Sequence, residues 1–239
     1  MGKETRRDFL TKCGTGIVGS LTTLSLPCIA SPVRNLLGTK ETLVGGHTEP
    51  LPYDSEVEYI QQSNNGQYIN TNIVPPVGSI LKSEFRFTRT GWQANMCGQN
   101  YDIFGFTVSA DGNFKAAAFD YWTIQAADTE WHTWLIDETK KYAKIDDGKA
   151  VTIRAHSTSS RPYCIFCRKR TDNNIDGRCT MACCHSLSLR TSSEKLLDMI
   201  AVRFTNEQGI SEGAMYDKVS KSLFRNAGTG SFLIGSDRG

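Results

Sequence analysis

The stretch Leu81–Phe87, with the sequence LKSEFRF, alternates between two kinds of side chain from one residue to the next. In an extended chain, successive side chains point to opposite faces, so the two kinds separate. One face takes Leu81, Ser83, Phe85 and Phe87, and the other takes Lys82, Glu84 and Arg86. A period of two over this length predicts a β-strand.

The same alternation recurs along the chain, and long helical periodicity is almost absent. It is clear in Phe104–Val108 and in Ile200–Phe204. Turn signals separate such runs: Pro75-Pro76, Asp111-Gly112-Asn113, Asp146-Asp147-Gly148 and Asp176-Gly177. Many short strands with this spacing predict an all-β protein, built as a sandwich or jelly roll.

Three stretches resemble parts of a concanavalin A-like lectin/glucanase domain, a family related to laminin-G-like modules and frequent in bacterial surface proteins. Glu58–Ile73 (EYIQQSNNGQYINTNI) resembles its opening, Glu130–Gly148 (EWHTWLIDETKKYAKIDDG) its central hairpin, and Gly213–Gly235 (GAMYDKVSKSLFRNAGTGSFLIG) its closing strands. The resemblance implies a concanavalin A-like jelly roll of two antiparallel sheets. It describes a fold and names no ligand, because one fold can carry many functions.

The N-terminal stretch Thr5–Leu10 (TRRDFL) resembles the signature of twin-arginine export signals, in which an arginine pair precedes Phe-Leu. The match is carried by Arg6, Arg7, Phe9 and Leu10. An uncharged run follows from Cys13 to Ile29, and the small Ala30 suits cleavage after that residue. The glycines and Pro27 within this region disfavour a permanent membrane span.

These patterns predict three parts of the chain. Residues 1–30 would be a twin-arginine-type signal peptide, residues 31–52 a linker or loosely ordered arm, and residues 53–239 the concanavalin A-like domain. The signal implies that the twin-arginine export machinery is a partner. It also implies that the protein is exported to the periplasm, the cell surface or the medium.

The charge balance of the exported part narrows the choice of partners. Four of the 27 basic and two of the 25 acidic residues lie in the first 30 residues, so 23 of each remain. Nucleic acid and anionic membrane surfaces are bound through concentrated positive charge. We therefore expect neither as a partner, and expect a glycan or a cell-surface ligand instead.

The acidic residues offer no convincing catalytic pair. Glucan-cleaving members of the resembled fold use paired carboxylates on one internal strand. Glu56 and Glu58 would share one face of a strand, but they stand at the start of the domain. The histidines after Ala30 lie in no recognisable nucleophile motif; they are His47, His132, His156 and His185. We therefore expect no catalytic residues and no cofactor.

Six cysteines remain after residue 30: Cys97, Cys164, Cys167, Cys179, Cys183 and Cys184. A zinc site needs paired sulfurs that converge on a tight turn. The apolar, strand-like stretch Tyr163–Cys167 would instead send its two sulfurs to opposite faces. The same alternation would place Cys183 with Leu187 and Leu189 on one face, and Cys184 on the other. We expect no metal site, and the fifteen possible disulfide pairings stay open.

The aromatic residues suggest where a ligand would bind. Sugars stack on aromatic rings while polar side chains orient their hydroxyls. The candidates near expected strand ends and loops are Trp92, Tyr101, Asp120, Tyr121 and Trp122, whereas Trp131 and Trp134 are expected in the core. The sequence thus favours a non-catalytic carbohydrate- or surface-ligand-binding module. A glycoside hydrolase with an unrecognised acidic pair and a structural or adhesive protein-binding domain remain alternatives.

Overall fold

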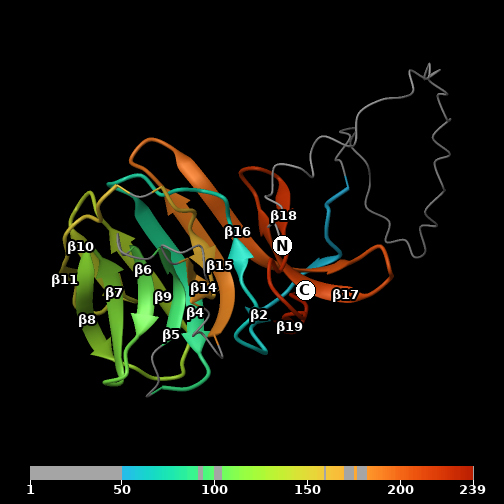
Figure 1. Ribbon diagram of the computed structural model, residues 1–239, viewed down its shortest axis with the longest axis horizontal. Coiled ribbons are helices and arrows are strands. Elements are labelled where there is room, and N and C mark those ends of the chain that lie inside the picture. The colour runs from blue at the N-terminus through green and yellow to red at the C-terminus, as the bar shows by residue number, and fades with distance from the viewer. Residues whose placement is uncertain are drawn as a thin grey trace, which may run out of the picture. The chain divides into compact units, whose positions relative to one another are not determined.

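A computed structural model describes residues 50–90, 94–99, 104–158, 160–169, 175–176 and 182–238, all within the unit Glu49–Gly239 (Figure 1). The expected signal peptide and most of the expected arm lie outside the described residues. Every regular element that the structure describes is a strand, which confirms the all-β prediction. In these ranges there is no helix long and apolar enough to cross a membrane.

The strands form two sheets. The larger sheet runs in the order β11 (Val151–Thr152), β10 (Tyr142–Ile145), β9 (His132–Asp137), β4 (Ile80–Phe87), β15 (Ala182–Arg190), β16 (Lys195–Thr205), β17 (Ser211–Asp217) and β18 (Ser222–Phe224). It also includes β1 (Ser55–Glu56), β2 (Ile60–Gln61) and β19 (Leu233–Ile234). The pairings of this sheet are antiparallel.

The smaller sheet runs in the order β14 (Ile175–Asp176), β13 (Arg168–Lys169), β5 (Ala94–Gln99), β6 (Phe104–Val108), β7 (Asn113–Ala118) and β8 (Asp120–Ala126). Two short strands, β12 (Cys164–Ile165) and β3 (Ile69–Asn70), pair beside β5. β13 pairs with β5 in parallel, and the other pairings are antiparallel.

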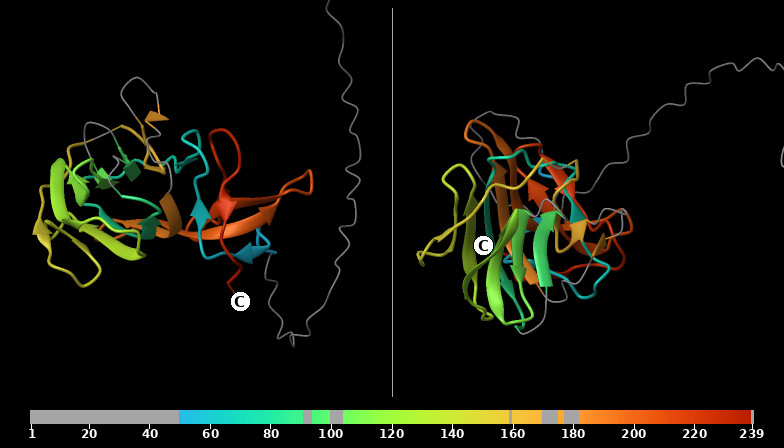
Figure 2. Two further views of the ribbon diagram at one scale, coloured as in Figure 1. Left: turned by 90° about the horizontal axis from the view of Figure 1, so that it is seen from below. Right: turned by 60° about the vertical axis from the view of Figure 1, so that its left-hand side comes forward.

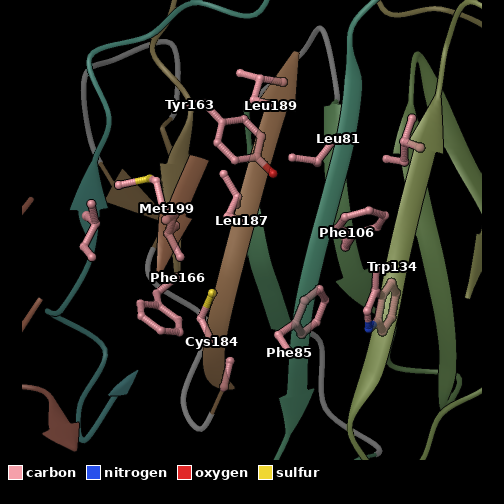
Figure 3. Packing of buried hydrophobic residues seen from close by; sticks show 14 of the residues in the cluster. Leu81, Phe85, Phe106, Trp134, Tyr163, Phe166, Cys184, Leu187, Leu189 and Met199 are labelled. Carbon is pink, nitrogen blue, oxygen red and sulfur yellow. The ribbon is translucent and has the colours of Figure 1, made fainter. Parts of the chain in front are cut away.

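The core lies between the two sheets (Figure 3). Phe85 on β4 stacks on Trp134 of β9 with ring centroids 4.5 Å apart. From the smaller sheet, Phe106 and Phe114 bring their rings to 5.1 and 4.7 Å from Trp134. Aromatic rings bury large apolar areas and prefer stacked or tilted pairs at these separations. The two sheets are therefore packed face to face as a β-sandwich.

The faces of β4 follow its alternation. Leu81, Phe85 and Phe87 are fully or almost fully buried in the core, and Ser83 is buried with them, whereas Lys82 is exposed. Glu84 and Arg86 are only partly buried on the outer face of the larger sheet. The prediction from LKSEFRF is thus confirmed residue by residue.

In two hairpins of the larger sheet, an aspartate at the end of the first strand holds the turn by hydrogen bonds. At the end of β9, the Asp137 carboxylate accepts hydrogen bonds from the backbone N–H of Lys140, at 3.0 Å, and from the Thr139 hydroxyl. At the end of β17, Asp217 accepts from the backbone N–H and the hydroxyl of Ser220. Aspartate side chains commonly hold turns in this way. Each loop then returns through a lysine with positive φ, Lys141 and Lys221.

The two ends of the described chain lie side by side, as the left view of Figure 2 shows. β19 pairs with β2, and the backbone N–H groups of Ala227 and Thr229 donate to the carbonyls of Tyr68 and Gly66. The stretches that resemble the opening and the closing of the lectin-like domain therefore contact each other directly. This contact also brings the last described residues, up to Arg238, beside the segment that joins β1 and β2.

Candidate functional site

The larger sheet forks in the middle of β15. Residues Ser186–Arg190 pair with β16, whereas Cys183 and Cys184 pair with β2. β16 pairs with β15 only as far as Ile200, and residues beyond it pair with β1. The segment from β1 to β2 thus fills the opening between β15 and β16, and its corner is Glu58-Tyr59.

His185 stands at the base of the fork. The register between β15 and β4 shifts between Cys184 and Ser186, which leaves His185 as an extra residue, a β-bulge. Its Nδ1 donates to the backbone oxygen of Glu58 at 2.8 Å. Its Nε2 accepts from Nη1 of Arg238 at 2.7 Å, since a guanidinium has only donors. His185 therefore links Glu58, in the segment between β1 and β2, to Arg238 in the C-terminal tail.

Backbone hydrogen bonds hold that tail along the inserted segment. The N–H of Gly235 donates to Tyr59, and the N–H of Arg238 donates to Glu56, each at 2.9 Å. Between them, Val57 and Asp237 form an antiparallel bridge. The side chain of Arg238 thus reaches the fork because β2 and β19 align the two ends of the chain.

A cavity of about 420 Å³ opens at this place on the outer face of the larger sheet. We call it the fork cavity; its lining is Glu58, Tyr59, Glu84, Arg86, Trp131, His185 and Arg238. Pockets that bind small ligands combine aromatic walls with a few convergent polar groups. The fork cavity has both, drawn from five separate stretches of the sequence.

The aromatic wall is the pair Tyr59 and Trp131, whose ring centroids are 5.9 Å apart. The guanidinium carbon of Arg86 lies 5.8 Å from the Tyr59 ring centroid and 5.3 Å from that of Trp131. Such cation–π contacts hold an arginine side chain in place. Nε of Arg86 is buried and has no hydrogen-bond partner among the described residues. The cavity therefore has a cationic group held against its aromatic wall.

The fork cavity carries two positive and two negative side chains: Arg86 and Arg238 against Glu58 and Glu84. Within the described ranges, neither arginine forms an ion pair with either glutamate. Charged side chains of opposite sign thus face the same space without pairing with one another. A ligand with hydroxyl groups, which both donate and accept, complements such a lining.

The ligand-binding residues expected from the sequence lie elsewhere. Trp92 and Tyr101 are outside the described residues. Asp120, Tyr121 and Trp122 begin β8, at the edge of the smaller sheet. Tyr121 is exposed, whereas Trp122 packs against the core and its indole N–H donates to the Ala118 oxygen at 3.1 Å. The structure does not join them to the fork cavity, and ligand contact there stays a prediction.

One of the two tryptophans expected in the core lies elsewhere. Trp134 is in the core as predicted, but Trp131 is half-buried and lines the fork cavity, so the expected core pair is wrong. Glu58 lines the cavity, whereas Glu56 does not. Burial, and then the Glu56 carboxylate, raises the pKa of Tyr53, so Glu56 lies near Tyr53. Glu84 is the second carboxylate of the cavity, beside Glu58.

The cysteine-bearing strands also depart from simple alternation. The strand expected at Tyr163–Cys167 ends at Ile165, because Phe166 adopts a positive φ of 69°. On β15 the bulge at His185 reverses the expected faces: Cys184 is in the core with Leu187, and Cys183 faces outward beside Arg86. The Cys97 side chain and Cys179 lie outside the described residues. The described part holds no cluster of three or more metal-ligating side chains, and the absence of a metal site stays a prediction.

His132 forms a second polar cluster at the start of β9. Its Nδ1 lies 2.6 Å from Asp146 and its Nε2 lies 2.7 Å from Asp128. Burial of the ring by itself lowers the pKa of His132, but the hydrogen bonds to both carboxylates outweigh burial and raise that pKa. The imidazolium form is thus stabilised in the folded protein.

A pH dependence of stability follows from this cluster. Because the folded-state pKa is raised, the cluster stabilises the fold fully below the unfolded pKa of about 6.5, and less as the pH rises through the folded pKa. We expect His132→Asn to reduce the fall in melting temperature between about pH 6 and pH 8. Thermal unfolding of both proteins across this range measures the difference. Parallel curves for the two proteins would contradict the assignment to His132.

Comparison of the chain with protein-family models, with curated proteins and with solved structures finds no match.

Proposed function

We propose that this protein is an exported carbohydrate-binding module of the concanavalin A-like lectin type, and that the fork cavity is its binding site. The proposal combines the twin-arginine-like N-terminus, the lectin-like stretches and the β-sandwich with the lining of the cavity. The observation that carries it is the aromatic pair Tyr59 and Trp131 beside an arginine and two glutamates.

The charges of the cavity favour an uncharged sugar at this position. Two arginines and two glutamates give no net charge to attract an ion. Sugar hydroxyls accept from guanidinium groups and donate to carboxylates, so one sugar ring satisfies both kinds of side chain. The apolar face of the ring is left for Trp131, the larger of the two aromatic side chains.

The first test is binding of neutral linear sugars to the purified protein. The probes are cello-, xylo-, manno- and laminari-oligosaccharides, measured by titration calorimetry. An open site with one or two ring contacts predicts a dissociation constant on the order of 0.1–1 mM for the best of them. No binding of any probe by the folded protein would contradict the proposal.

Trp131→Ala is expected to weaken the best of these interactions at least about tenfold, which is about 1.4 kcal/mol. The variant removes one wall of the site, yet the half-buried Trp131 lies outside the core, so the melting temperature should change little. Tyr121→Ala is the matched control, because it removes an exposed ring from the other candidate surface. If only the Tyr121 variant lost binding, the binding site would lie at β8 and not in the fork cavity.

A glycoside hydrolase is the second candidate function, because Glu58 and Glu84 both line the fork cavity. Most glycoside hydrolases use two carboxylates that flank the scissile bond of one sugar. A reducing-sugar assay on the calorimetry samples distinguishes the two functions. A binding module releases no product, whereas product formation that Glu58→Gln or Glu84→Gln abolishes would identify an enzyme.

A further inference from the structure

A second hollow lies on the same outer face of the larger sheet. It has a volume of about 450 Å³, and we call it the lysine hollow; Lys82, Leu135, Lys144 and Arg190 are among its lining residues. Lys82 on β4, Leu135 on β9 and Lys144 on β10 are direct cross-strand partners. Side chains paired in this way lie on one face of a sheet and close together. The hollow is therefore a row of two lysines flanking one leucine, with Arg190 beside it.

The two cavities adjoin. Glu84, which lines the fork cavity, is the cross-strand partner of Thr133, which lines the lysine hollow. Along β4 the lining residues Lys82, Glu84 and Arg86 follow one another on the outer face, over about 14 Å at about 3.4 Å per residue. A ligand that extends from the fork cavity along β4 thus enters the lysine hollow.

The charge of the lysine hollow differs from that of the fork cavity. Its three basic side chains, Lys82, Lys144 and Arg190, face two acidic ones, Asp146 and Asp147. Asp146 already accepts hydrogen bonds from the His132 ring and from the Thr133 N–H. Asp147 lies 3.5 Å from Nζ of Lys144.

Two cations are then left over. In the described ranges, neither Lys82 nor Arg190 forms an ion pair. Their positions are linked through the register, because Lys82 pairs with Ser188, two residues before Arg190. Two uncompensated cations at a concave surface concentrate positive potential there.

We propose that the lysine hollow is a second subsite, which binds a carboxylate or sulfate group of the same glycan chain. The inference rests on the proposed function of the fork cavity and adds the class of ligand: a linear acidic polysaccharide. One of its sugar rings stacks on Trp131, and a charged group further along the chain meets Lys82 and Arg190. Arginine is suited to such planar or tetrahedral oxyanions because its N–H groups form paired hydrogen bonds.

The test compares charged and neutral oligosaccharides of equal length on the full protein. Oligogalacturonate carries carboxylates, chondroitin sulfate oligosaccharides carry sulfates as well, and the neutral probes are those that bind the fork cavity. The key variant is Lys82→Ala/Arg190→Ala. The control is Lys218→Ala/Arg154→Ala, which removes the same two charges from exposed positions outside both cavities.

We expect a charged probe to bind the wild type more tightly than the neutral one. Lys82→Ala/Arg190→Ala should weaken the charged probe about five- to tenfold and leave the neutral probe unchanged. The control variant should bind both like the wild type. Raising the salt concentration should weaken only the charged probe, because exposed charges are screened.

Three outcomes would overturn this inference, and they separate it from the proposed function. If the charged probe binds the Lys82/Arg190 variant as tightly as the wild type, the second subsite is wrong while sugar binding stands. The same holds if the control variant loses as much affinity, because the effect is then one of overall charge. If no neutral probe binds the wild type, the proposed function fails and the subsite, which rests on it, fails with it.

Discussion

Replacing Glu138 by alanine is expected to lower the free energy of unfolding by about 3–5 kcal/mol, because it removes the common acceptor of a buried hydrogen-bond network. The side chains of Glu138 and His156 are both fully buried. One carboxylate oxygen accepts from the backbone N–H and from Nδ1 of His156, each at 2.7 Å. The other accepts from the N–H groups of Gly78 and Ser79 at 3.0 and 3.1 Å.

The size of this effect comes from the donors that are left behind. Alanine at position 138 would leave three buried N–H groups and the partly buried N–H of Gly78 without an acceptor, and each unpaired buried donor is costly. The carboxylate also joins three parts of the chain: the end of β9, the start of β4 and the loop at His156, whose ring lies 4.8 Å from that of Phe104. Its loss therefore loosens both sheets together.

Denaturant unfolding monitored by tryptophan fluorescence measures the change in unfolding free energy. Glu130→Ala is the matched control, because Glu130 is exposed and its removal should cost less than about 0.5 kcal/mol. Glu138→Gln should lie between the two, since an amide oxygen keeps part of the acceptor capacity. A cost below about 1 kcal/mol for Glu138→Ala would contradict the hydrogen-bond network described.

Gly228→Ala is expected to destabilise the domain by about 3 kcal/mol or more, at the upper end of overpacking effects. A Cβ at this position would lie 1.6 Å from the carbonyl oxygen of Gly66 and 2.8 Å from its carbonyl carbon. Backbone atoms cannot rotate away as a long side chain can, so the two segments must separate. These segments are the ones that align the two ends of the chain.

The matched control is Gly112→Ala. Gly112 also lies in a turn, but no atom is within 4 Å of the position that an alanine Cβ would take, and only its positive φ of 75° opposes a side chain. That strain costs about 1 kcal/mol. Gly228→Ala should also weaken sugar binding, because displacement of the tail removes Arg238 from the fork cavity. Equal melting temperatures for the two variants would contradict the close approach at Gly66.

The sequence is most informative where one strand has one buried and one outer face. LKSEFRF predicts both faces of β4, because in a regular strand every second side chain lies on the same face and is buried or exposed with it. Trp134 can likewise be assigned to the core. The same alternation gives the wrong faces at β15, because the bulge at His185 adds a residue and exchanges the faces of Cys183 and Cys184. A bulge of this kind has no marker in the sequence, since His185 is neither a glycine nor part of a turn signal.

The fork cavity could not be predicted because its parts are distant in the sequence. Glu58 and Arg238 are brought together by pairing between the first and the last strands, which no local pattern specifies. The local pattern misplaces Trp131 in the core for the same reason: its exposure depends on the fork beside it and not on its neighbours in the chain. One signal is present, since Glu84 and Arg86 share the outer face of β4. The fold class thus follows from local periodicity, whereas the site follows from long-range pairing.

The most direct measurement of the central claim is a titration of protein labelled with nitrogen-15 at its four tryptophans. Each indole N–H gives its own resonance, and the best neutral oligosaccharide from the calorimetry is the probe. Binding in the fork cavity predicts that the Trp131 indole resonance shifts with added sugar, while those of Trp122 and Trp134 stay in place. A shift of the Trp122 resonance with an unmoved Trp131 resonance would contradict the account and place the ligand at the smaller sheet.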